Sequence, residues 1–467
     1  MSKALVWMRR DLRLDDQAAL SFATQKFDEV YLVFVFDQNI LSKLKDKDDP
    51  RVSFLHRRLT FLEEHEDIKM YKLFGDPAKL IPKLASDLSV DCVVTNNDYE
   101  RYARNRDRSV ARDLAGLKIE FKSFKDQVIF ESDEVLTGSG DFYRVFTPFK
   151  NKWFDQIQEN PHVIEEKKVN KSKITYKKVK GYSSELDLSD IGFEANEIDT
   201  LWEVDPRKRW KTFQKRMESY HTKRDIPAIE GTSTLSPYLR FGYISVRKLV
   251  SFALKQHTEG ARVWASEIAW RDFYFGLLAV YPHVEKHAYN PTYENIPWEN
   301  DKTLFKKWCE GKTGVPIVDA GMRQLNETGW MHNRVRMIVA SYLTKTLLID
   351  WRWGERYFAR KLMDFDLAAN NGGWQWSAST GCDAAPYFRV FNPYRQSERF
   401  DPKGEYIKTY VSELRELGSK SIHDPSALRP SLLEKIDFVP DKDYPNPIAD
   451  YSSNRKKVIS WFKKANA

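Results

Sequence analysis

The most informative stretch of the sequence is Asp364-Phe-Asp-Leu-Ala-Ala-Asn-Asn-Gly-Gly-Trp-Gln-Trp376. Two acids, two adjacent asparagines, two adjacent glycines and two tryptophans fall within these thirteen residues. Adjacent glycines let the backbone approach another group closely, at an entropic cost that ordinary packing does not require. One interpretation is a loop between two helices whose tryptophans fill the core. The other is a wall around a flat, polar, aromatic ligand, with carboxylates and amides that fix its edges.

Composition limits the class of protein. The chain has 467 residues, enough for two or three domains, and 42% of them are apolar, which is typical of a globular protein. A net charge of +8 is consistent with a polyanionic partner but does not identify one. Three widely spaced cysteines without a C-x-x-C pattern indicate a reducing compartment, with neither disulfides nor zinc. Because no apolar run reaches the roughly 20 residues of a membrane span and the N-terminus reads as a strand, we expect a soluble, cytoplasmic protein.

Residues 1–130 show apolar runs that alternate with amphipathic patterns. The expected strands are Lys3–Met8, Val30–Phe36, Lys69–Phe74, Asp91–Thr95 and Ile119–Phe124. The expected helices are Gln17–Lys26, Arg51–His65, Pro77–Leu88 and Asn105–Leu114. This alternation predicts a parallel α/β domain with right-handed crossovers.

The first strand is not followed by G-x-G-x-x-G. It is followed by Arg9-Arg-Asp-Leu-Arg-Leu-Asp-Asp16. We interpret this run as a salt-bridged turn in which Asp15 or Asp16 caps the next helix, and therefore as structure rather than chemistry.

Residues 131–205 are expected to be an interdomain linker, because charges accumulate there without a helical stripe. The lysines of this segment are Lys167, Lys168, Lys171, Lys173, Lys177, Lys178 and Lys180. A solvated linker is favoured over a DNA-binding arm. The remaining residues, 206–467, then form a helical domain.

Two segments of the helical domain carry polar groups with alternative roles. The turn Gly231–Pro237 is rich in hydroxyl groups that either cap the following helix or cradle a phosphate. The helix expected over Ala261–Val280 places Glu267 and Arg271 among apolar residues, where burial is costly without partners. These two side chains either pair with each other or bind a ligand.

A further helix is expected over Arg207–Lys223.

One nucleotide-binding motif and one metal site are considered and rejected. Gly311-Lys-Thr313 lacks the glycine that a Walker A loop requires at Lys306. His332 has no second histidine at a metal-binding spacing, so no metal site is expected.

The stretch that ends at Trp376 resembles the flavin-binding heart of the DNA photolyase/cryptochrome family, and is closest to class I cyclobutane pyrimidine dimer photolyases. The resemblance extends over nearly the whole chain. It implies a Rossmann-like α/β domain, a large helical domain that binds flavin adenine dinucleotide (FAD), UV-damaged DNA as the substrate, and a monomer. Cleavage of a pyrimidine dimer requires an electron to be delivered and recovered, which is cofactor chemistry.

The resemblance also implies roles for individual residues. The cofactor-binding residues would be Tyr220, Thr232, Ser233, Thr234, Leu235, Ser236, Trp264, Arg271, Arg336, Asp364, Asp366 and Asn370. The substrate-binding residues would be Glu267, Trp270, Asn333, Arg334, Met337 and Trp376, with Glu267 and Asn370 also bearing on catalysis. A chain of tryptophans that photoreduces oxidised flavin would be Trp374, Trp351 and Trp298.

Asn333 and Met337 also indicate the damage class. The (6-4) photoproduct branch of the family carries proton-transferring histidines at these two positions, so we expect repair of cyclobutane dimers only. A cryptochrome-type blue-light receptor on the same fold is the main alternative, and a flavin enzyme that uses a nicotinamide is the second.

An antenna chromophore is expected in the α/β domain. Folate binders that resemble this chain place a glutamate where Arg104 stands, and a cation cannot accept the N–H groups of a pterin. Asp98 and Arg240 match positions that deazaflavin binders use. We therefore expect 8-hydroxy-5-deazaflavin ahead of flavin mononucleotide, with folate disfavoured; the alternative is an empty pocket with two surface charges.

Overall fold

The computed structural model describes residues 1–435 and 438–467, which form two compact units. The first unit comprises residues 1–215 and 234–282, and the second comprises residues 216–233 and 283–467. The chain passes from one unit to the other three times. Among the residues described, no helix combines the length and apolarity needed to cross a bilayer.

The first unit contains a five-stranded sheet in the order β3-β2-β1-β4-β5, and neighbouring strands pair in parallel. The strands are β1 (Lys3–Met8), β2 (Glu29–Asp37), β3 (Tyr71–Gly75), β4 (Cys92–Asn96) and β5 (Glu120–Phe124). The helices between them are α1 (Ala18–Lys26), α2 (Gln38–Leu41), α3 (Pro50–Glu66), α4 (Pro77–Leu88) and α5 (Arg101–Gly116). The predicted parallel α/β fold is confirmed.

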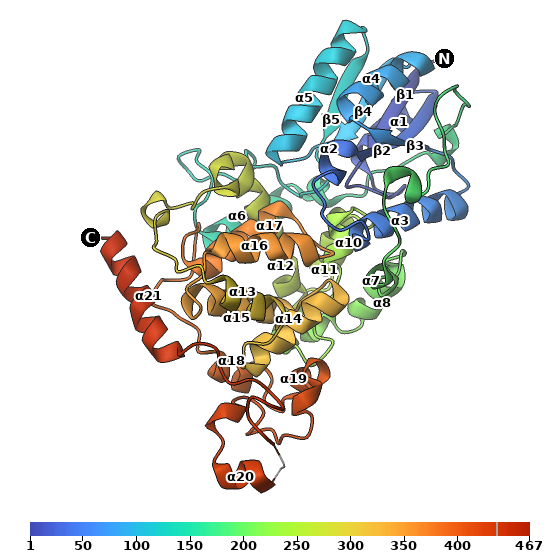
Figure 1. Cartoon of the computed structure of the whole chain (residues 1–467). Coiled ribbons are helices and arrows are strands. Elements are labelled where there is room, and N and C mark those ends of the chain that lie inside the picture. Colours follow the sequence, from blue (N-terminus) through green and yellow to red (C-terminus); the bar gives the residue numbers. More distant parts are fainter. Residues whose placement is uncertain (436–437) are drawn as a thin grey trace. The chain divides into compact units, whose positions relative to one another are not determined.

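The central strand β1 is covered on both faces. Leu5 and Trp7 join a core that includes residues of α4 and α5, which pack side by side (Figure 1). Ala4 and Val6 point to the opposite face and are also buried. Burial on both faces explains why these strands read as continuous apolar runs rather than alternating ones.

The Arg9–Asp16 turn is salt-bridged as expected, but it does not cap α1. The cap is Gln17, whose side chain accepts a hydrogen bond from the backbone N–H of Leu20. Asp16 has a positive φ of 47° and binds Arg247 through its carboxylate at 2.8 Å. Its geometry therefore serves a buried ion network rather than the helix N-terminus.

This ion network joins the turn to helix α11 (Val246–Leu254). Asp126 lies between Arg13, at 2.7 Å, and Arg247, at 2.8 Å. All of these side chains are almost completely buried, so each charge depends on its partners. The network supports the interpretation of this motif as structure.

The segment expected to be a linker contains ordered structure. Helix α6 (Phe146–Glu159) buries Trp153, whose indole N–H donates to Asp272 at 2.9 Å. Farther along, the backbone N–H of Thr175 donates to the carbonyl of Val30 in β2. The lysines of the segment are mostly exposed, so the main chain is attached to the sheet while the charges are solvated.

The helix expected over Arg207–Lys223 is broken. It is divided into α8 (Arg207–Gln214), the 3-10 turn η4 (Met217–Ser219) and α9 (Tyr220–Lys223). The break coincides with the passage between the units at residue 215. The apolar residues of this regular pattern therefore belong to two different units.

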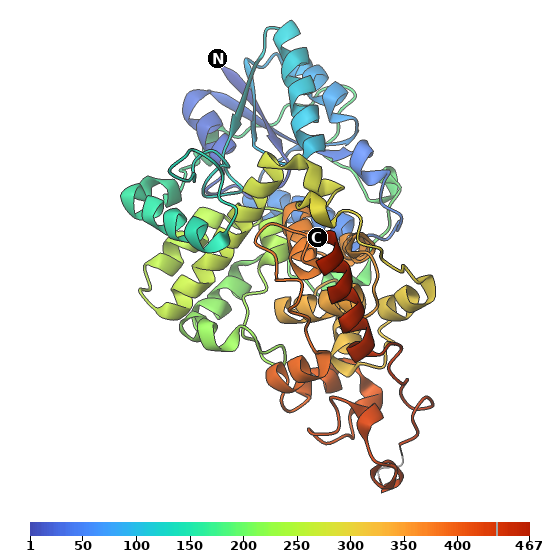
Figure 2. The same ribbon diagram turned by 90° about the vertical axis from the view of Figure 1, so that its left-hand side faces the viewer.

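The rest of the first unit is helical, with α7 (Glu197–Thr200), α10 (Ser236–Arg240), α11 (Val246–Leu254) and α12 (Glu259–Val280). The second unit contains α13 (Lys302–Cys309), α14 (Pro316–Thr328), α15 (Asn333–Lys345), α16 (Trp351–Lys361), α17 (Leu367–Ala378), α18 (Pro393–Phe400), α19 (Glu405–Tyr410), α20 (Pro430–Lys435) and α21 (Tyr451–Ala465). Short 3-10 turns are η1 (Pro161–Ile164), η2 (Lys171–Lys173), η3 (Ser189–Ile191), η5 (Pro282–Glu285), η6 (Pro291–Tyr293), η7 (Ser412–Leu414) and η8 (Pro425–Ala427). The dark red helix in Figure 2 is α21.

The informative stretch 364–376 is helix α17 with its capping residues, not a loop. Asp366 caps the helix by accepting the backbone N–H groups of Ala368 and Ala369 at 3.1 and 3.4 Å. Helix α17 packs against α15 and α16 in the core of the second unit. Gly354 of α16 permits this packing, because a Cβ there would lie 2.1 Å from the ring of Trp374.

Candidate functional site

Asp364 carries a buried oxygen without a partner. Its Oδ2 accepts a hydrogen bond from Arg336 Nη2 at 2.8 Å. Its Oδ1 is buried and has no hydrogen-bond partner among the described residues. Leaving a buried acceptor unsatisfied costs about 1–3 kcal/mol. Asp364 is therefore suited to accept an N–H group of a ligand.

Helix α17 borders open space on the side of Gly373. A Cβ at Gly373 would meet no atom within 4 Å, and Asn370 lies one turn earlier on the same face. Asn370 donates from Nδ2 to the backbone carbonyl of Glu355 at 3.1 Å, which fixes the orientation of its amide. The neighbouring Asn371 faces inward and donates to the carbonyl of Val284 at 2.9 Å, so only the first asparagine can meet a ligand.

The hydroxyl-rich turn is shared between the units. Its first part lies in the second unit, where the carbonyl of Thr232 accepts from Arg216 Nη2 at 3.2 Å and Arg216 Nε is buried without a partner among the described residues. Ser233 also belongs to this part. Tyr220, which precedes it in the same unit, is buried. Guanidinium groups and hydroxyls are the donors that a diphosphate requires.

The second part of the turn lies in the first unit. Arg209 Nη1 donates to Thr234 Oγ1 at 2.8 Å. Helix α10 begins at Ser236 and its capping residue is the buried Leu235, which has no side-chain group to cap it. The N-cap residue of this helix is therefore not one of the hydroxyl residues of the turn.

Helix α12 presents a half-buried stripe in the first unit. The half-buried residues lie three to four positions apart on the helix: Glu267, Trp270, Arg271 and Tyr274. Trp270 stacks on Phe146, with ring centroids 3.5 Å apart and an interplanar angle of 11°. Arg271 donates to the carbonyl of Gln127. By contrast, Trp264 is buried against Trp210 and Phe213 and is part of the core.

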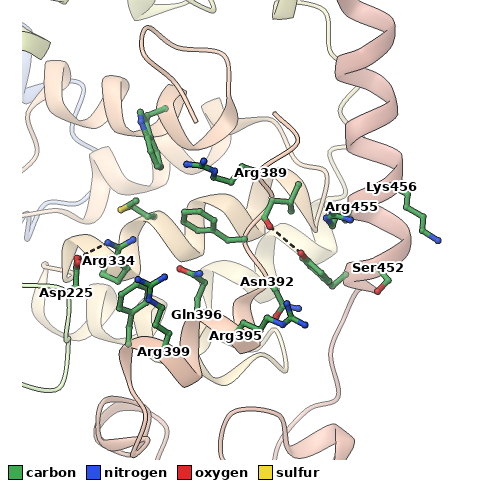
Figure 3. Close-up of a pocket in the computed structure, with 16 residues that line it drawn as sticks. Asp225, Arg334, Arg389, Asn392, Arg395, Gln396, Arg399, Ser452, Arg455 and Lys456 are labelled. Carbon is green, nitrogen blue, oxygen red and sulfur yellow. Dashed lines mark hydrogen bonds and ion pairs between the residues drawn. The ribbon is translucent and has the colours of Figure 1, made fainter. Parts of the chain in front are cut away.

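The second unit contains a cavity of about 850 Å³ (Figure 3). Three predicted substrate residues line it: Arg334, Met337 and Trp376. Arg334 pairs with Asp225 at 2.9 Å. The amide of Asn333 lies 3.8 Å from the sulfur of Met337. The structure thus brings four of the predicted substrate residues together.

The rim of this cavity is strongly basic. The sequence alone did not predict that these cations come together. The cations are Arg389, Arg395, Arg399, Arg455 and Lys456, all exposed. None of them forms an ion pair with a carboxylate in the part of the chain that is described. The one available sequence signal was the like-charged pair Arg395 and Arg399, four residues apart on one helix face, because such pairs are unfavourable unless an anion binds.

His332 has a structural role. Its Nδ1 accepts the backbone N–H of Arg334 at 3.1 Å, which caps α15. Burial lowers the pKa of His332 to about 4, so it is neutral at physiological pH. A neutral ring is required for this cap, since protonation would remove the acceptor.

The three predicted tryptophans range from core to surface within the second unit. Trp374 is 3% exposed, and its ring meets the rings of Phe358 and Trp308 at 5.0 and 6.1 Å. Trp351 is 1% exposed, and its indole N–H has no partner among the described residues. Trp298 is half-buried beside Phe462.

The predicted antenna residues are not surface charges. Asp98 pairs with Arg10 at 3.3 Å, and the side chains of Asp98 and Arg240 are only 8% and 17% exposed. Burial alone would raise the pKa of Asp98, but Arg10 and neighbouring arginines outweigh that effect and lower it. Arg104 extends to the carbonyl of Ala279 at 3.5 Å. The interpretation of Asp98 and Arg240 as free surface charges is therefore wrong.

Comparison with known proteins agrees with this fold. Residues 4–168 match the family model for DNA photolyase, and residues 264–464 match the model for the FAD binding domain of DNA photolyase. The deoxyribodipyrimidine photo-lyase of Vibrio cholerae is 40% identical over 99% of this chain and 99% of its own. The chain therefore belongs to the DNA photolyase family.

Two solved structures share the whole architecture. A bacterial class III photolyase from Agrobacterium tumefaciens has a TM-score of 0.90 at 32% identity and covers 100% of this chain and 98% of its own. An archaeal photolyase from Sulfolobus tokodaii, solved with two FAD molecules, has a TM-score of 0.79 at 32% identity and covers 99% of this chain and 100% of its own.

Proposed function

We propose that this protein is a light-dependent deoxyribodipyrimidine photo-lyase that splits cyclobutane pyrimidine dimers in DNA. The observation that carries the proposal is the cavity of the second unit, which combines an aromatic and a thioether wall, Trp376 and Met337, with a rim of unpaired cations. An apolar wall suits an extruded base, and cations suit the phosphates on either side of it.

The described residues fit FAD as the cofactor. Within the second unit, the unpartnered oxygen of Asp364 would accept a ring N–H, and Arg336 holds that carboxylate in place. The open space beside Gly373 and Asn370 leaves room for a flat group. Thr232, Ser233 and Arg216 offer donors for phosphate oxygens. When bound in its reduced form, FAD would supply the light-driven electron that dimer cleavage requires.

The remaining roles belong to side chains around the substrate. Trp376 would stack on the extruded dimer, and stacking on an aromatic ring is worth about 1–3 kcal/mol per base. The amide of Asn333, beside Met337, would hydrogen-bond a pyrimidine edge. Arg334 would hold a backbone phosphate. We assign Glu267 and Trp270 of α12 to substrate binding as well.

Cleavage breaks two carbon–carbon bonds and returns two pyrimidines, with no net gain or loss of electrons. Neither Asn333 nor Met337 can donate or accept the proton that a (6-4) photoproduct would require. The substrate is therefore the cyclobutane dimer, and we propose that the protein acts as a monomer.

Illumination of the flavin-loaded protein with a DNA oligonucleotide that carries one cyclobutane dimer tests the proposal. We expect the pyrimidine absorbance to return in the light and not in the dark, and no repair of a matched (6-4) oligonucleotide. A flavin that responds to blue light without any repair would favour a cryptochrome-type receptor. Oxidation of NADH by the protein would favour a redox enzyme.

We also propose an antenna chromophore in the first unit, with 8-hydroxy-5-deazaflavin favoured over flavin mononucleotide. The proposal is supported by Asp98 and Arg240, which lie close enough to interact in a network with Arg10 and Glu100. Arg104 disfavours a folate, because a guanidinium group only donates hydrogen bonds.

A further inference from the structure

A lysine without an acidic partner is buried in the second unit. Lys345 is the last residue of α15 and is 1% exposed, although lysine is almost never fully buried unless it is paired. Burial alone lowers its pKa to about 7, since no charged neighbour among the described residues contributes to the shift. Its Nζ donates to the hydroxyl of Ser379 at 2.6 Å. Burying an amine costs free energy, and the contact with Ser379 offsets part of that cost.

Ser379 ends helix α17 in a strained conformation. It is the C-cap residue of the helix, and its φ of 67° lies in the left-handed region that residues other than glycine rarely adopt. Its backbone N–H donates to the carbonyl of Trp376 at 3.3 Å, and the N–H of Ala385 donates to the same carbonyl at 3.2 Å. The position of Ser379 therefore bears directly on the last turn of α17, which carries Trp376.

Lys345 is placed at the carboxyl ends of two helices. It is the final residue of α15, and it binds the residue that ends α17. The carboxyl end of a helix carries a partial negative charge, which favours a nearby cation. Helix α17 contains no charged side chain of its own. Lys345 therefore supplies to the end of α17 a positive group that the helix itself lacks.

The contact between Lys345 and Ser379 joins the two helices that supply one wall of the cavity. Met337 lines the cavity from α15, about two turns before Lys345. Trp376 lines it from α17, which packs against α15. Lys345 itself does not line the cavity. The lysine is therefore placed to affect the wall without touching a ligand.

We propose that Lys345 is a positioning residue for the lesion-binding site, and that it acts through Ser379 to hold the last turn of α17 and with it Trp376. This inference rests on the proposed function, because that function assigns Trp376 to stacking on the extruded dimer. Stacking depends on the position and orientation of the ring. A last turn that is no longer held would therefore present the ring less well to the dimer.

A double-mutant cycle with Trp376 tests the proposal in the full-length, FAD-loaded protein. The ligand is a fluorescently labelled single-stranded oligonucleotide with one cyclobutane dimer, and anisotropy gives its Kd. We expect W376A to bind about 5- to 150-fold more weakly than the wild type, because the ring no longer stacks on the dimer. We expect K345M to bind about fivefold more weakly. Because Lys345 acts through Trp376, K345M/W376A should bind as W376A does.

The matched control is K72M. Lys72 is also a buried lysine, but it lies in the first unit and pairs with Glu63 at 2.8 Å. We expect K72M to melt at a lower temperature than the wild type and to bind the dimer oligonucleotide equally well. A loss of affinity in K345M but not in K72M separates positioning from general destabilisation.

A second variant, S379G, removes the hydroxyl without straining the backbone. Glycine adopts a positive φ readily, so the turn at the end of α17 is retained while the partner of Lys345 is lost. We expect S379G to keep its fold and its flavin and to bind the dimer as weakly as K345M does. If K345M unfolds or loses its flavin, S379G and S379G/W376A carry the test.

Fluorine NMR reads the position of Trp376 without DNA. Labelling with fluorotryptophan gives each tryptophan a resonance, and the spectrum of W376F assigns the one that belongs to Trp376. We expect this resonance to shift or broaden in K345M and S379G and to stay unchanged in K72M. An unchanged resonance in both K345M and S379G would overturn the proposal. So would a K345M/W376A variant that binds the dimer about fivefold more weakly than W376A, because Lys345 would then act by a route other than Trp376.

Failure of the proposed function would look different. In that case the wild type would not prefer damaged over undamaged DNA, and W376A would bind both as the wild type does. The fluorine spectra of the wild type, K345M and S379G would still decide whether Lys345 positions Trp376.

Discussion

At the scale of single residues, Glu267 has the sharpest alternative roles. It lies half-buried on α12, on the same face as Trp270. If it holds a base, Glu267→Ala should weaken binding of dimer-containing DNA by about 5- to 150-fold, because a lost hydrogen bond to a buried group costs about 1–3 kcal/mol. Titration of the variant with damaged oligonucleotide measures this effect. A variant that instead loses its flavin or unfolds would show that Glu267 serves an internal ion pair.

Trp374 permits a second test at this scale. Its burial in the core suits an electron relay only if it lies next to the flavin. We expect Trp374→Phe to abolish photoreduction of oxidised flavin while repair by pre-reduced protein continues. Transient absorption after a light pulse measures photoreduction in Trp374→Phe and in Trp308→Phe, which is the matched aromatic control. Undiminished photoreduction in Trp374→Phe would mean that electrons arrive by another path.

At the scale of helices, two glycines give opposite predictions for one substitution. In Gly354→Ala the new methyl would lie 2.1 Å from Trp374 and 2.6 Å from Leu343, so it overpacks the contact between α16 and α17. Overpacking typically costs about 1–3 kcal/mol. In Gly373→Ala the methyl meets nothing within 4 Å, and replacing a helical glycine by alanine gains about 0.5–1 kcal/mol.

Melting of the flavin-free protein checks both changes, and flavin titration adds a second measurement. We expect Gly354→Ala to melt lower and Gly373→Ala to melt higher than the wild type. If the open space beside Gly373 holds the flavin, Gly373→Ala should also bind FAD more weakly. Equal FAD affinity in Gly373→Ala and the wild type would place the cofactor elsewhere.

The contact of α6 with α12 predicts a pH dependence. Asp272 accepts hydrogen bonds from Trp153 and from the backbone N–H groups of Ile129 and Phe130. Burial raises its pKa to about 6, despite these donors. A carboxyl group whose pKa is raised on folding stabilises the protein below its unfolded pKa of about 3.8, and this contribution is lost as the pH rises to about 6.

The wild type should therefore lose more stability than Asp272→Asn between about pH 4 and pH 6, by up to roughly 3 kcal/mol. Denaturant unfolding followed at several pH values measures the difference between the two proteins. Other buried carboxyl groups contribute equally to both curves, so the difference reports Asp272. If the free energy of unfolding changes equally with pH in the two proteins, the raised pKa of Asp272 is contradicted.

The contrast between helices also explains which features the sequence could predict. The strands and most helices were predictable because each has a single core to face. The break near residue 215 was not, since Trp210 and Phe213 belong to one unit and Met217 and Tyr220 to the other. The cap at Gln17 was missed because the carboxylate of Asp16 is used by Arg247, a partner more than two hundred residues away.

At the scale of the whole molecule, some candidate site residues could be named from the sequence and others could not. Those carried by an unusual local motif, such as Asp364, Asn370 and Trp376, could be named from the sequence. The basic rim could not, because Arg389, Arg395 and Arg455 come from a loop and two helices that meet only in the folded chain. Exposed arginines are also common, so no local pattern separates those that converge from those that do not.

The complete set of chromophores is the last prediction and belongs to the whole molecule. Asp98 and Arg240 are held in a network with Arg10 and Glu100 in the first unit. A chromophore that binds there should be a polar ring system with both donors and acceptors at its edge, as a deazaflavin or flavin is. Purification from the native source, followed by denaturation and chromatography of the released chromophores, should yield FAD and a second, flavin-like compound. Expression in a host that cannot make the deazaflavin should yield FAD alone. A released folate would contradict the prediction, and FAD alone from the native source would mean that the charge network of Asp98 and Arg240 is structural.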